Sequence, residues 1–306
     1  MTRAPPPPTG YRREGSTASA ALAAYLGLAI GDALGATVEF MTPREITAQY
    51  RIHRQLIGGG WLKLKPGQVT DDTTMALALG GSILETGRVE AHAAARAFDQ
   101  WMRGKPVDIG STVRRGLLSF RKSGNPEMPL SEHDAGNGAA MRILPVALAT
   151  LGRPEPEVRA ACRVQAHVTH HNPLSDAATE TLALMVQDAL LGADKLDLLH
   201  RHAHPLAGQH PEFAFRACRQ RLNPSGYIVE TMQAVFQGFF DTDTFEECLI
   251  DVANRGGDAD TTGAIAGMLA GSVYGPAGIP RRWLDGLDAD TRRACQAQAL
   301  ALLEIA

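Results

Sequence analysis

Two short segments of the sequence crowd carboxylates and hydroxyls into single turns: VTDDTT at 69–74 and GGDADTT at 256–262. Aspartates this close repel each other unless a positive charge lies between them. Their oxygens, with no cysteine or histidine among them, suit Mg²⁺ or Mn²⁺ rather than Zn²⁺. Four carboxylates exceed the needs of one divalent ion, so the pattern predicts two ions that share ligands, lower the pKa of a bound water and polarise a substrate oxygen. The candidate ligands are Thr70, Asp71, Asp72, Asp258, Asp260 and Thr261.

Helix capping is the alternative role for these residues, because Asp and Thr side chains commonly accept hydrogen bonds from the first N–H groups of a helix. One cap needs one such residue, whereas at least four occur together in each of the two turns. We therefore favour the metal site and leave capping open. Thr262 is assigned either to a cap or to the support of a ligand.

Further acidic positions follow glycine-containing or proline-containing segments. In GDALGATVEF, Asp32 is equally consistent with a structural residue held by an amide and with a site residue, and Glu39 follows a glycine turn that could point it into a site. In PVDIGSTVRRG, Asp108 and Ser111 precede a predicted helix. Asp108 is therefore either an N-cap or a site carboxylate.

A glycine-rich turn, AGNGAAMRILPVAL at 135–148, is predicted to open a helix. Gly136 and Gly138 would expose backbone N–H groups at the helix N-terminus, which favours an anion such as a diphosphate. An ordinary Asn-Gly turn is the alternative, and this motif alone favours it.

Three histidines recur at i, i+3 and i+4 in AHVTHHNP: His167, His170 and His171. That spacing can bind zinc, but no cysteine or acidic residue lies near in the sequence to complete a site. We favour one histidine facing a polar substrate.

Helical signals dominate the elements that must position these residues. Apolar residues at helical spacing, with glycines past the ends, predict helices over 74–87, 88–104, 172–192, 226–240, 244–257 and 291–306. Residues 54–68 are interpreted as a functional loop. Small residues follow both acidic turns, and such residues let helices approach closely, so we expect these two helices to pack side by side. The sequence predicts an all-α, compact multi-helix array with a single domain at 17–306, preceded by a disordered N-terminal tail at 1–16.

Composition argues against several classes of function. The formal net charge of −3 provides no basic field, so we expect no nucleic-acid partner. The four cysteines are scattered without a C-x-x-C pair, as in proteins of a reducing cytosol. The apolar run ALAAYLGLAI ends in Gly31 and Asp32 without a clear cleavage site, so we expect a first core helix and a cytoplasmic protein rather than a signal peptide.

Over about residues 20–275, the sequence resembles the ADP-ribosylglycohydrolases. The resemblance is carried by GLAIGDALGATVEF, GQVTDDTTMALAL, PVDIG, GNGAAMR, THHNPLSDAA, SGYIVETMQAVF and GGDADTTGAIAGMLAGSVYG, in family order. It implies an orthogonal all-α array with a dinuclear site for two divalent cations, Mn²⁺ preferred and Mg²⁺ possible, on the six ligands already listed. It also implies catalytic roles for Glu39, which would position a water, and Asp108, which would transfer a proton. The implied substrate-binding residues are Ser111, Gly136, Asn137, Gly138, His170 and Tyr227.

Within this family the chain looks most like the branch that acts on the nitrogenase iron protein of nitrogen-fixing bacteria. The resemblance therefore implies hydrolysis of ADP-ribose from a protein arginine. It also implies association with a PII signalling protein and an ammonium transporter, which would bring a cytoplasmic protein reversibly to the membrane. Three alternatives stay open at this point: another ADP-ribosylated substrate, serine-linked or small; a non-catalytic crystallin-like relative; and a metallophosphatase.

Overall fold

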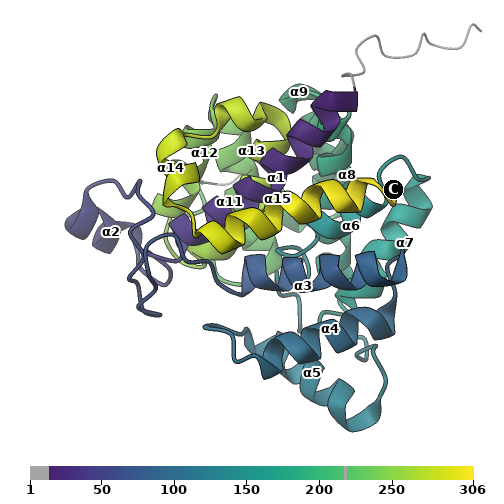
Figure 1. The fold of residues 1–306 in the computed structure, drawn as a ribbon. Coiled ribbons are helices and arrows are strands. Elements are labelled where there is room, and N and C mark those ends of the chain that lie inside the picture. The colour runs from purple at the N-terminus through teal and green to yellow at the C-terminus, as the bar shows by residue number, and fades with distance from the viewer. Residues whose placement is uncertain (1–13, 217–218) are drawn as a thin grey trace, which may run out of the picture.

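A computed structural model describes residues 14–216 and 219–306, which fold into helices joined by turns and form no β-strand (Figure 1). The all-α prediction is confirmed. The α-helices are α1 (Glu14–Gly35), α2 (Pro43–Tyr50), α3 (Asp71–Thr86), α4 (Ala91–Arg103), α5 (Ser111–Ser123), α6 (Leu144–Ala149), α7 (Glu155–Ala166), α8 (Pro173–Leu190), α9 (Lys195–Leu198), α10 (His204–Gln209), α11 (Ile228–Asp241), α12 (Phe245–Asn254), α13 (Ala259–Tyr274), α14 (Arg281–Gly286) and α15 (Ala289–Leu303). Short π- and 3₁₀-helical turns are η1 (Leu199–Ala203), η2 (Pro211–Phe213) and η3 (Pro276–Gly278).

The predicted helix ends depend on local signals that the structure reproduces. α3 ends at Gly87, whose φ of 70° is left-handed and whose N–H donates to Ile83. α8 begins after Asn172, whose side chain accepts hydrogen bonds from the N–H groups of Leu174 and Ser175. The glycine turn differs from the prediction, because residues 138–142 form turns and the following helix, α6, begins only at Leu144.

The central pair of helices is α1 and α13, which lie against each other in antiparallel contact (Figure 1). A Cβ atom added at Gly31 would lie 1.9 Å from the carbonyl oxygen of Gly263, and one added at Gly267 would lie 2.0 Å from that of Gly27. The two backbones therefore touch along a seam of small residues. The expectation that α13 packs along α3 is wrong: α1 carries its own matching glycines and occupies that face.

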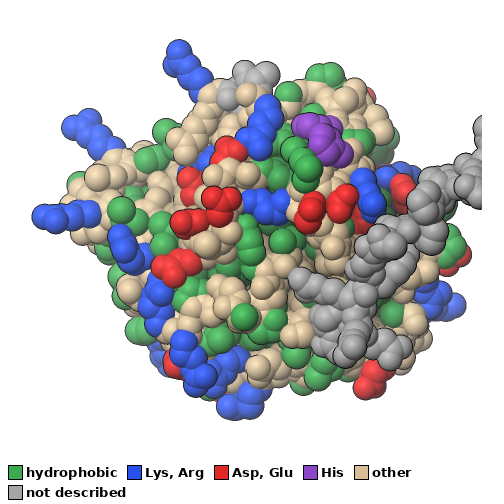
Figure 2. Space-filling view, turned by 90° about the horizontal axis from the view of Figure 1, so that it is seen from above, with side chains coloured by type: hydrophobic (Ala, Val, Ile, Leu, Met, Phe, Trp, Pro, Cys, Tyr) green, Lys and Arg blue, Asp and Glu red, His purple; other side chains and the backbone are tan. Residues whose placement is uncertain are grey.

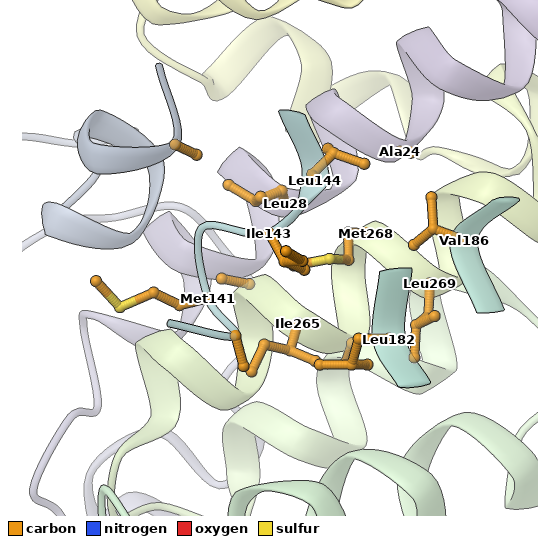
Figure 3. Packing of buried hydrophobic residues seen from close by; sticks show 14 of the residues in the cluster. Ala24, Leu28, Met141, Ile143, Leu144, Leu182, Val186, Ile265, Met268 and Leu269 are labelled. Carbon is orange, nitrogen blue, oxygen red and sulfur yellow. The ribbon is translucent and has the colours of Figure 1, made fainter. Parts of the chain in front are cut away.

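Aliphatic side chains of these and neighbouring helices fill the interior. Figure 3 shows Leu28 of α1, Leu182 and Val186 of α8, and Ile265 and Met268 of α13 converging on one buried cluster. Helix α15 crosses the outside of α1 and α3, where Gln298 donates to the carbonyl oxygen of Leu77 at 2.9 Å. Helices α4 and α5 form a further layer beyond α3 (Figure 1). This packing fixes the N-terminal ends of α3 and α13 relative to the C-terminal end of α1.

The first helix passes a length-and-composition test for a membrane span over Thr17–Gly35, but 83% of that window is buried inside the protein, as expected of the predicted core helix. The predicted tail lies outside the described residues except for 14–16, which belong to α1. On the face shown in Figure 2, the described basic and acidic side chains are interspersed.

Candidate active site

The two acidic turns meet at the bottom of a cavity, although they are far apart in the chain. The Thr70 hydroxyl lies 3.2 Å from a carboxylate oxygen of Asp72 and 3.5 Å from one of Asp260. From the other turn, the Thr261 hydroxyl lies 3.3 Å from the same oxygen of Asp72. The structure therefore brings the predicted ligands of both turns into one cluster.

Asp32, at the C-terminal end of α1, supports this cluster from below. Its fully buried carboxylate accepts hydrogen bonds from the N–H and hydroxyl of Thr70, at 2.9 and 3.0 Å, and from those of Thr73, at 3.1 and 2.5 Å. Asp32 thus has the structural role that the sequence left open, and it caps α3 from another helix. The N-cap residues Thr70 and Asp258 make no side-chain capping bond of their own, so their oxygens are not used to cap the helices.

Three further carboxylates approach each other at the same place. Oxygens of Glu39, Asp108 and Asp260 all lie within 4.8 Å of one another. The segment before α5 supplies Asp108, which accepts the N–H of Ile109 at 2.7 Å, while the N-cap of α5 is Gly110. Asp108 is therefore a cavity carboxylate rather than the cap.

A cavity of about 370 Å³ opens above these groups. It is lined by Glu39, Phe40, Trp61, Asp71, Asp108, Ile109, Gly110, Ser111, Thr112, Val113, Gly136, Asn137, Gly138, Met141, His170, Gly226, Asp258, Asp260 and Thr261. Of the predicted site residues, Thr70 and Asp72 lie buried behind this lining. Tyr227 is 40% exposed and lies at the margin, where it forms a β-bridge with Gly136.

Crowding and burial make the carboxylates difficult to ionise. Burial, reinforced by the charges of Asp258 and Asp108, raises the pKa of Glu39 to about 8. Burial, together with Asp108 and Asp32, raises the pKa of Asp71 to about 7. The pKa values of Asp72 and Asp260 lie well above the ordinary range for the same reasons, burial first and neighbouring carboxylates second.

Cations fit this cluster for two structural reasons. The Oδ1 atom of Asp72 is buried and has no hydrogen-bond donor among the described residues. No Lys or Arg occurs among the described residues that line the cavity, so the lining itself offers no side-chain cation to pair with these carboxylates. A set of hard carboxylate and hydroxyl oxygens without a nitrogen or sulfur donor is typical of Mg²⁺ and Mn²⁺ sites.

The glycine turn forms another part of the cavity lining. The N–H of Asn137 donates to the carbonyl oxygen of Gly226 at 3.1 Å, so this amide is already bonded. The Asn137 side chain donates to Asp258 at 2.5 Å and to the Thr231 hydroxyl at 2.9 Å, and it therefore joins the glycine turn to the acidic turn. The neighbouring N–H of Gly138 makes no hydrogen bond within residues 14–216 and 219–306, which leaves it available to an anion.

His170 lies beneath this turn, and the adjacent histidine does not. A Cβ atom at Gly136 would lie 2.9 Å from its Nε2 atom, so the ring fills the space that the missing side chains leave. Burial, reinforced by the positive charge of Arg142, lowers the pKa of His170 to about 3, so the ring is neutral.

His171 and His167 form a separate cluster with Glu127. Their rings are stacked, with centroids 3.7 Å apart and 17° between the planes. Lone pairs in two nearly parallel planes cannot converge on one ion, and Nδ1 of His171 lies 2.7 Å from the carbonyl oxygen of Met128, to which it donates. The geometry therefore disfavours the zinc alternative.

Trp61 is a cavity residue that the sequence reasoning did not single out. It projects from the predicted functional loop, at a tight turn closed by the Gly59–Leu64 bridge. Its indole N–H donates to Glu39 at 2.6 Å, and its ring lies 5.4 Å from that of Phe40. Both rings are exposed, at 52% and 63%. The sequence feature that could have identified Trp61 is its position directly after three glycines.

Known proteins resemble this chain in both sequence and fold. A protein from Rhodospirillum rubrum, ADP-ribosyl-(dinitrogen reductase) glycohydrolase, is 52% identical over 94% of this chain and 96% of its own. ADP-ribosylarginine hydrolase Tri1 from Serratia proteamaculans is 32% identical over 90% of this chain and 76% of its own. The solved structure of an ADP-ribosylglycohydrolase-related protein complex matches with a TM-score of 0.84 and 36% identity, covering 95% of this chain and 99% of that one. The ADP-ribosylglycohydrolase family model matches residues 13–305. On this evidence the chain is a member of the ADP-ribosylglycohydrolase family.

Proposed function

We propose that the protein is a hydrolase that removes ADP-ribose from a modified arginine of the nitrogenase iron protein. The observation that carries this proposal is the cavity itself, whose lining combines carboxylates with a glycine turn that has an unbonded amide. A sugar with a diphosphate needs both kinds of group. The relative that is 52% identical is named for this substrate, and the 32% identical relative for ADP-ribosylarginine.

Two divalent cations are part of the proposal, with Mn²⁺ preferred and Mg²⁺ accepted. The residues that would hold them are Thr70, Asp71, Asp72, Asp258, Asp260 and Thr261. When bound, such cations supply Lewis-acid chemistry, which activates a water and polarises a substrate oxygen. The unpartnered oxygen of Asp72 and the lack of a basic side chain in the described lining support their presence.

The protein's own groups bind the substrate and move its protons. The N–H of Gly138 would donate to the diphosphate, with His170 beside it and Ser111 across the cavity. Tyr227, at the margin, would contact the outer part of the substrate. Hydrolysis forms a bond from water oxygen to the anomeric carbon and breaks the bond from that carbon to the guanidinium nitrogen. The water loses a proton and the leaving nitrogen gains one, and Asp108 is the carboxylate placed to transfer it. Glu39 would orient the water.

Several properties accompany the proposal. The protein would form a single domain over 17–306 and work in the cytoplasm. Association with a PII signalling protein and an ammonium transporter, and through them reversibly with the membrane, stays a prediction of the family resemblance. Co-purification from cells before and after an ammonium shift checks that association.

A direct test incubates the protein and Mn²⁺ with ADP-ribosylated nitrogenase iron protein, followed by intact mass. We expect loss of one ADP-ribose per modified subunit, and release from an arginine-linked peptide but not from a serine-linked one. Asp260→Asn removes one charge from the cluster and should lower Mn²⁺ affinity and turnover by about a hundredfold or more. Asp290→Asn, which changes an exposed aspartate paired with Arg293, is the matched control and should retain both. Full activity of the Asp260 variant, or preference for the serine linkage, would contradict the proposal.

A further inference from the structure

Arg142 is a buried cation that makes no salt bridge within the described part of the chain; the carboxylate of Asp71 acts on it only through its charge. Its side chain is fully buried beside the site. The guanidinium donates to the side-chain oxygen of Gln165 at 2.8 Å, to the main-chain oxygen of Gln165 at 3.0 Å and to the Thr169 hydroxyl at 2.8 Å, and it lies 4.3 Å from the centre of the Phe98 ring. A guanidinium only donates hydrogen bonds, so the Thr169 oxygen is an acceptor in this pair.

The same hydroxyl lies 2.8 Å from Nδ1 of His170. A threonine hydroxyl has one hydrogen to donate, and no other acceptor for it lies among the described contacts of Thr169. If Nδ1 carried a hydrogen, the Thr169 oxygen would accept from both Arg142 and the imidazole, and the hydroxyl hydrogen would be left buried without an acceptor. Every hydrogen-bonding group has a partner only when the Thr169 hydroxyl donates to an unprotonated Nδ1 of His170.

An imidazole that is neutral and unprotonated at Nδ1 carries its hydrogen at Nε2. This atom faces the glycine turn, where Cβ atoms at Gly136 and Gly138 would lie 2.9 and 3.1 Å away. Within residues 14–216 and 219–306, Nε2 has no hydrogen-bond acceptor of its own. The donor is therefore directed at whatever occupies the cavity. Rotating the ring would replace Nδ1 by a carbon opposite the Thr169 hydroxyl, so the same contact also fixes the ring orientation.

We propose that Arg142 and Thr169 are positioning residues that hold His170 in its Nε2–H tautomer, so that His170 donates a hydrogen bond to an oxygen of the ADP-ribose group and does not act as a base. This inference rests on the proposed function for the identity of the ligand. The tautomer itself is independent of the substrate and can be measured on the protein alone.

The first experiment determines the tautomer. Protein labelled with ¹⁵N-histidine gives ring-nitrogen correlations in a long-range ¹H–¹⁵N spectrum, and His170→Asn identifies which set belongs to His170. We expect one unprotonated, hydrogen-bonded Nδ1 and one protonated Nε2 in the wild type. A protonated Nδ1, or a mixture of the two tautomers, would overturn the inference whatever the enzyme hydrolyses.

The second experiment removes the Thr169 hydroxyl that links Arg142 to His170. Thr169→Val keeps the shape of the side chain without the hydroxyl, and Thr169→Ser keeps the hydroxyl as the matched control. We expect the valine variant to lose the single tautomer and to bind free ADP-ribose, in the presence of Mn²⁺, about three- to tenfold more weakly, as for one lost neutral hydrogen bond. We expect KM for the ADP-ribosylated substrate to rise more than kcat falls, and serine to restore wild-type behaviour.

These outcomes separate the inference from the proposed function. A purely structural role for Thr169 predicts a lower melting temperature with an unchanged His170 tautomer and an unchanged affinity for ADP-ribose. That result would refute the proposal that Arg142 and Thr169 position His170. Failure to hydrolyse ADP-ribosylarginine, with the tautomer and the ADP-ribose affinity as expected, would contradict the proposed function only. If the valine variant does not fold, the wild-type spectrum alone decides.

Discussion

The roles of some residues in this site follow from their neighbours in the sequence, whereas the roles of others depend on contacts with distant segments. The acidic turns were predictable because their aspartates and threonines are adjacent in the sequence and satisfy a simple chemical rule. The placement of Trp61 was not, because its function depends on a loop that approaches Glu39 from 22 residues away. The role of Asp32 was open for the same reason: it accepts hydrogen bonds from amides and hydroxyls at the start of α3, the first of them 38 residues later in the chain.

Trp61 should contribute to metal binding through Glu39. Trp61→Phe removes the N–H that donates to the carboxylate and keeps an aromatic ring against Phe40. We expect Mn²⁺ affinity, measured by calorimetry, to fall about tenfold, as for other residues that orient a ligand. Stability should change by less than about 0.5 kcal/mol, because the ring is half exposed.

Trp101→Phe is the control for this substitution. It removes another indole N–H, which donates to the Thr74 hydroxyl at 3.0 Å outside the cavity lining. We expect its Mn²⁺ affinity to remain that of the wild type. Equal losses in the two variants would mean that the Trp61–Glu39 bond has no special role.

At the scale of elements, the sequence predicted which helices exist better than how they pair. Helix ends are set by local residues such as Asn172 and Gly87, whereas pairing depends on surfaces that are distant in the chain. Both α1 and α3 contain small residues, so composition alone does not show which of the two packs against α13. The glycines at 27, 31 and 35 in α1 recur every four residues and match those of α13, and that register selects the partner.

The seam between α1 and α13 should tolerate no added atom. Gly31→Ala places a Cβ atom 1.9 Å from a main-chain oxygen of Gly263, and neither backbone can move without disturbing Asp32 next to it. We expect the free energy of unfolding in urea to fall by about 3 kcal/mol. Gly81→Ala is the control, since a Cβ atom there meets nothing within 4 Å on the exposed side of α3.

Alanine at position 81 should raise the free energy of unfolding by about 0.5–1 kcal/mol, as expected for glycine replacement inside a helix. A Gly31→Ala protein as stable as the wild type would show that the two helices are not in backbone contact.

At the scale of the whole molecule, the buried carboxylates link stability to pH and to metal. The pKa values of Asp32, Asp71 and Glu39 are raised to about 6, 7 and 8, mainly by burial. Between the ordinary carboxyl pKa and these values, the metal-free folded protein binds more protons than the unfolded chain. The stability that these carboxyl groups contribute to the folded protein is therefore present at low pH, and it is lost as the pH rises through about 6 to 8.

Calorimetric melting with a chelator should show this loss: we expect the metal-free protein to melt at a lower temperature at about pH 8 than at about pH 6. Saturating Mn²⁺ should raise the melting temperature at both pH values, and more at the higher one, because fewer protons must then be displaced. A metal-induced shift that is larger at about pH 6 would contradict the acidic cluster as the binding site.

The convergence of three helix ends on one cavity also sets an order of events in synthesis. Thr70 and Asp260 are 190 residues apart, so a nascent chain that has emerged only through α12 carries half of the oxygen cluster. Helix α1 is made before α13, so its glycine face stays uncovered until α13 appears. Such long-range pairing slows folding and leaves the glycine face open to wrong partners until then. The full set of oxygens that would hold metal can therefore form only after α13 has been made.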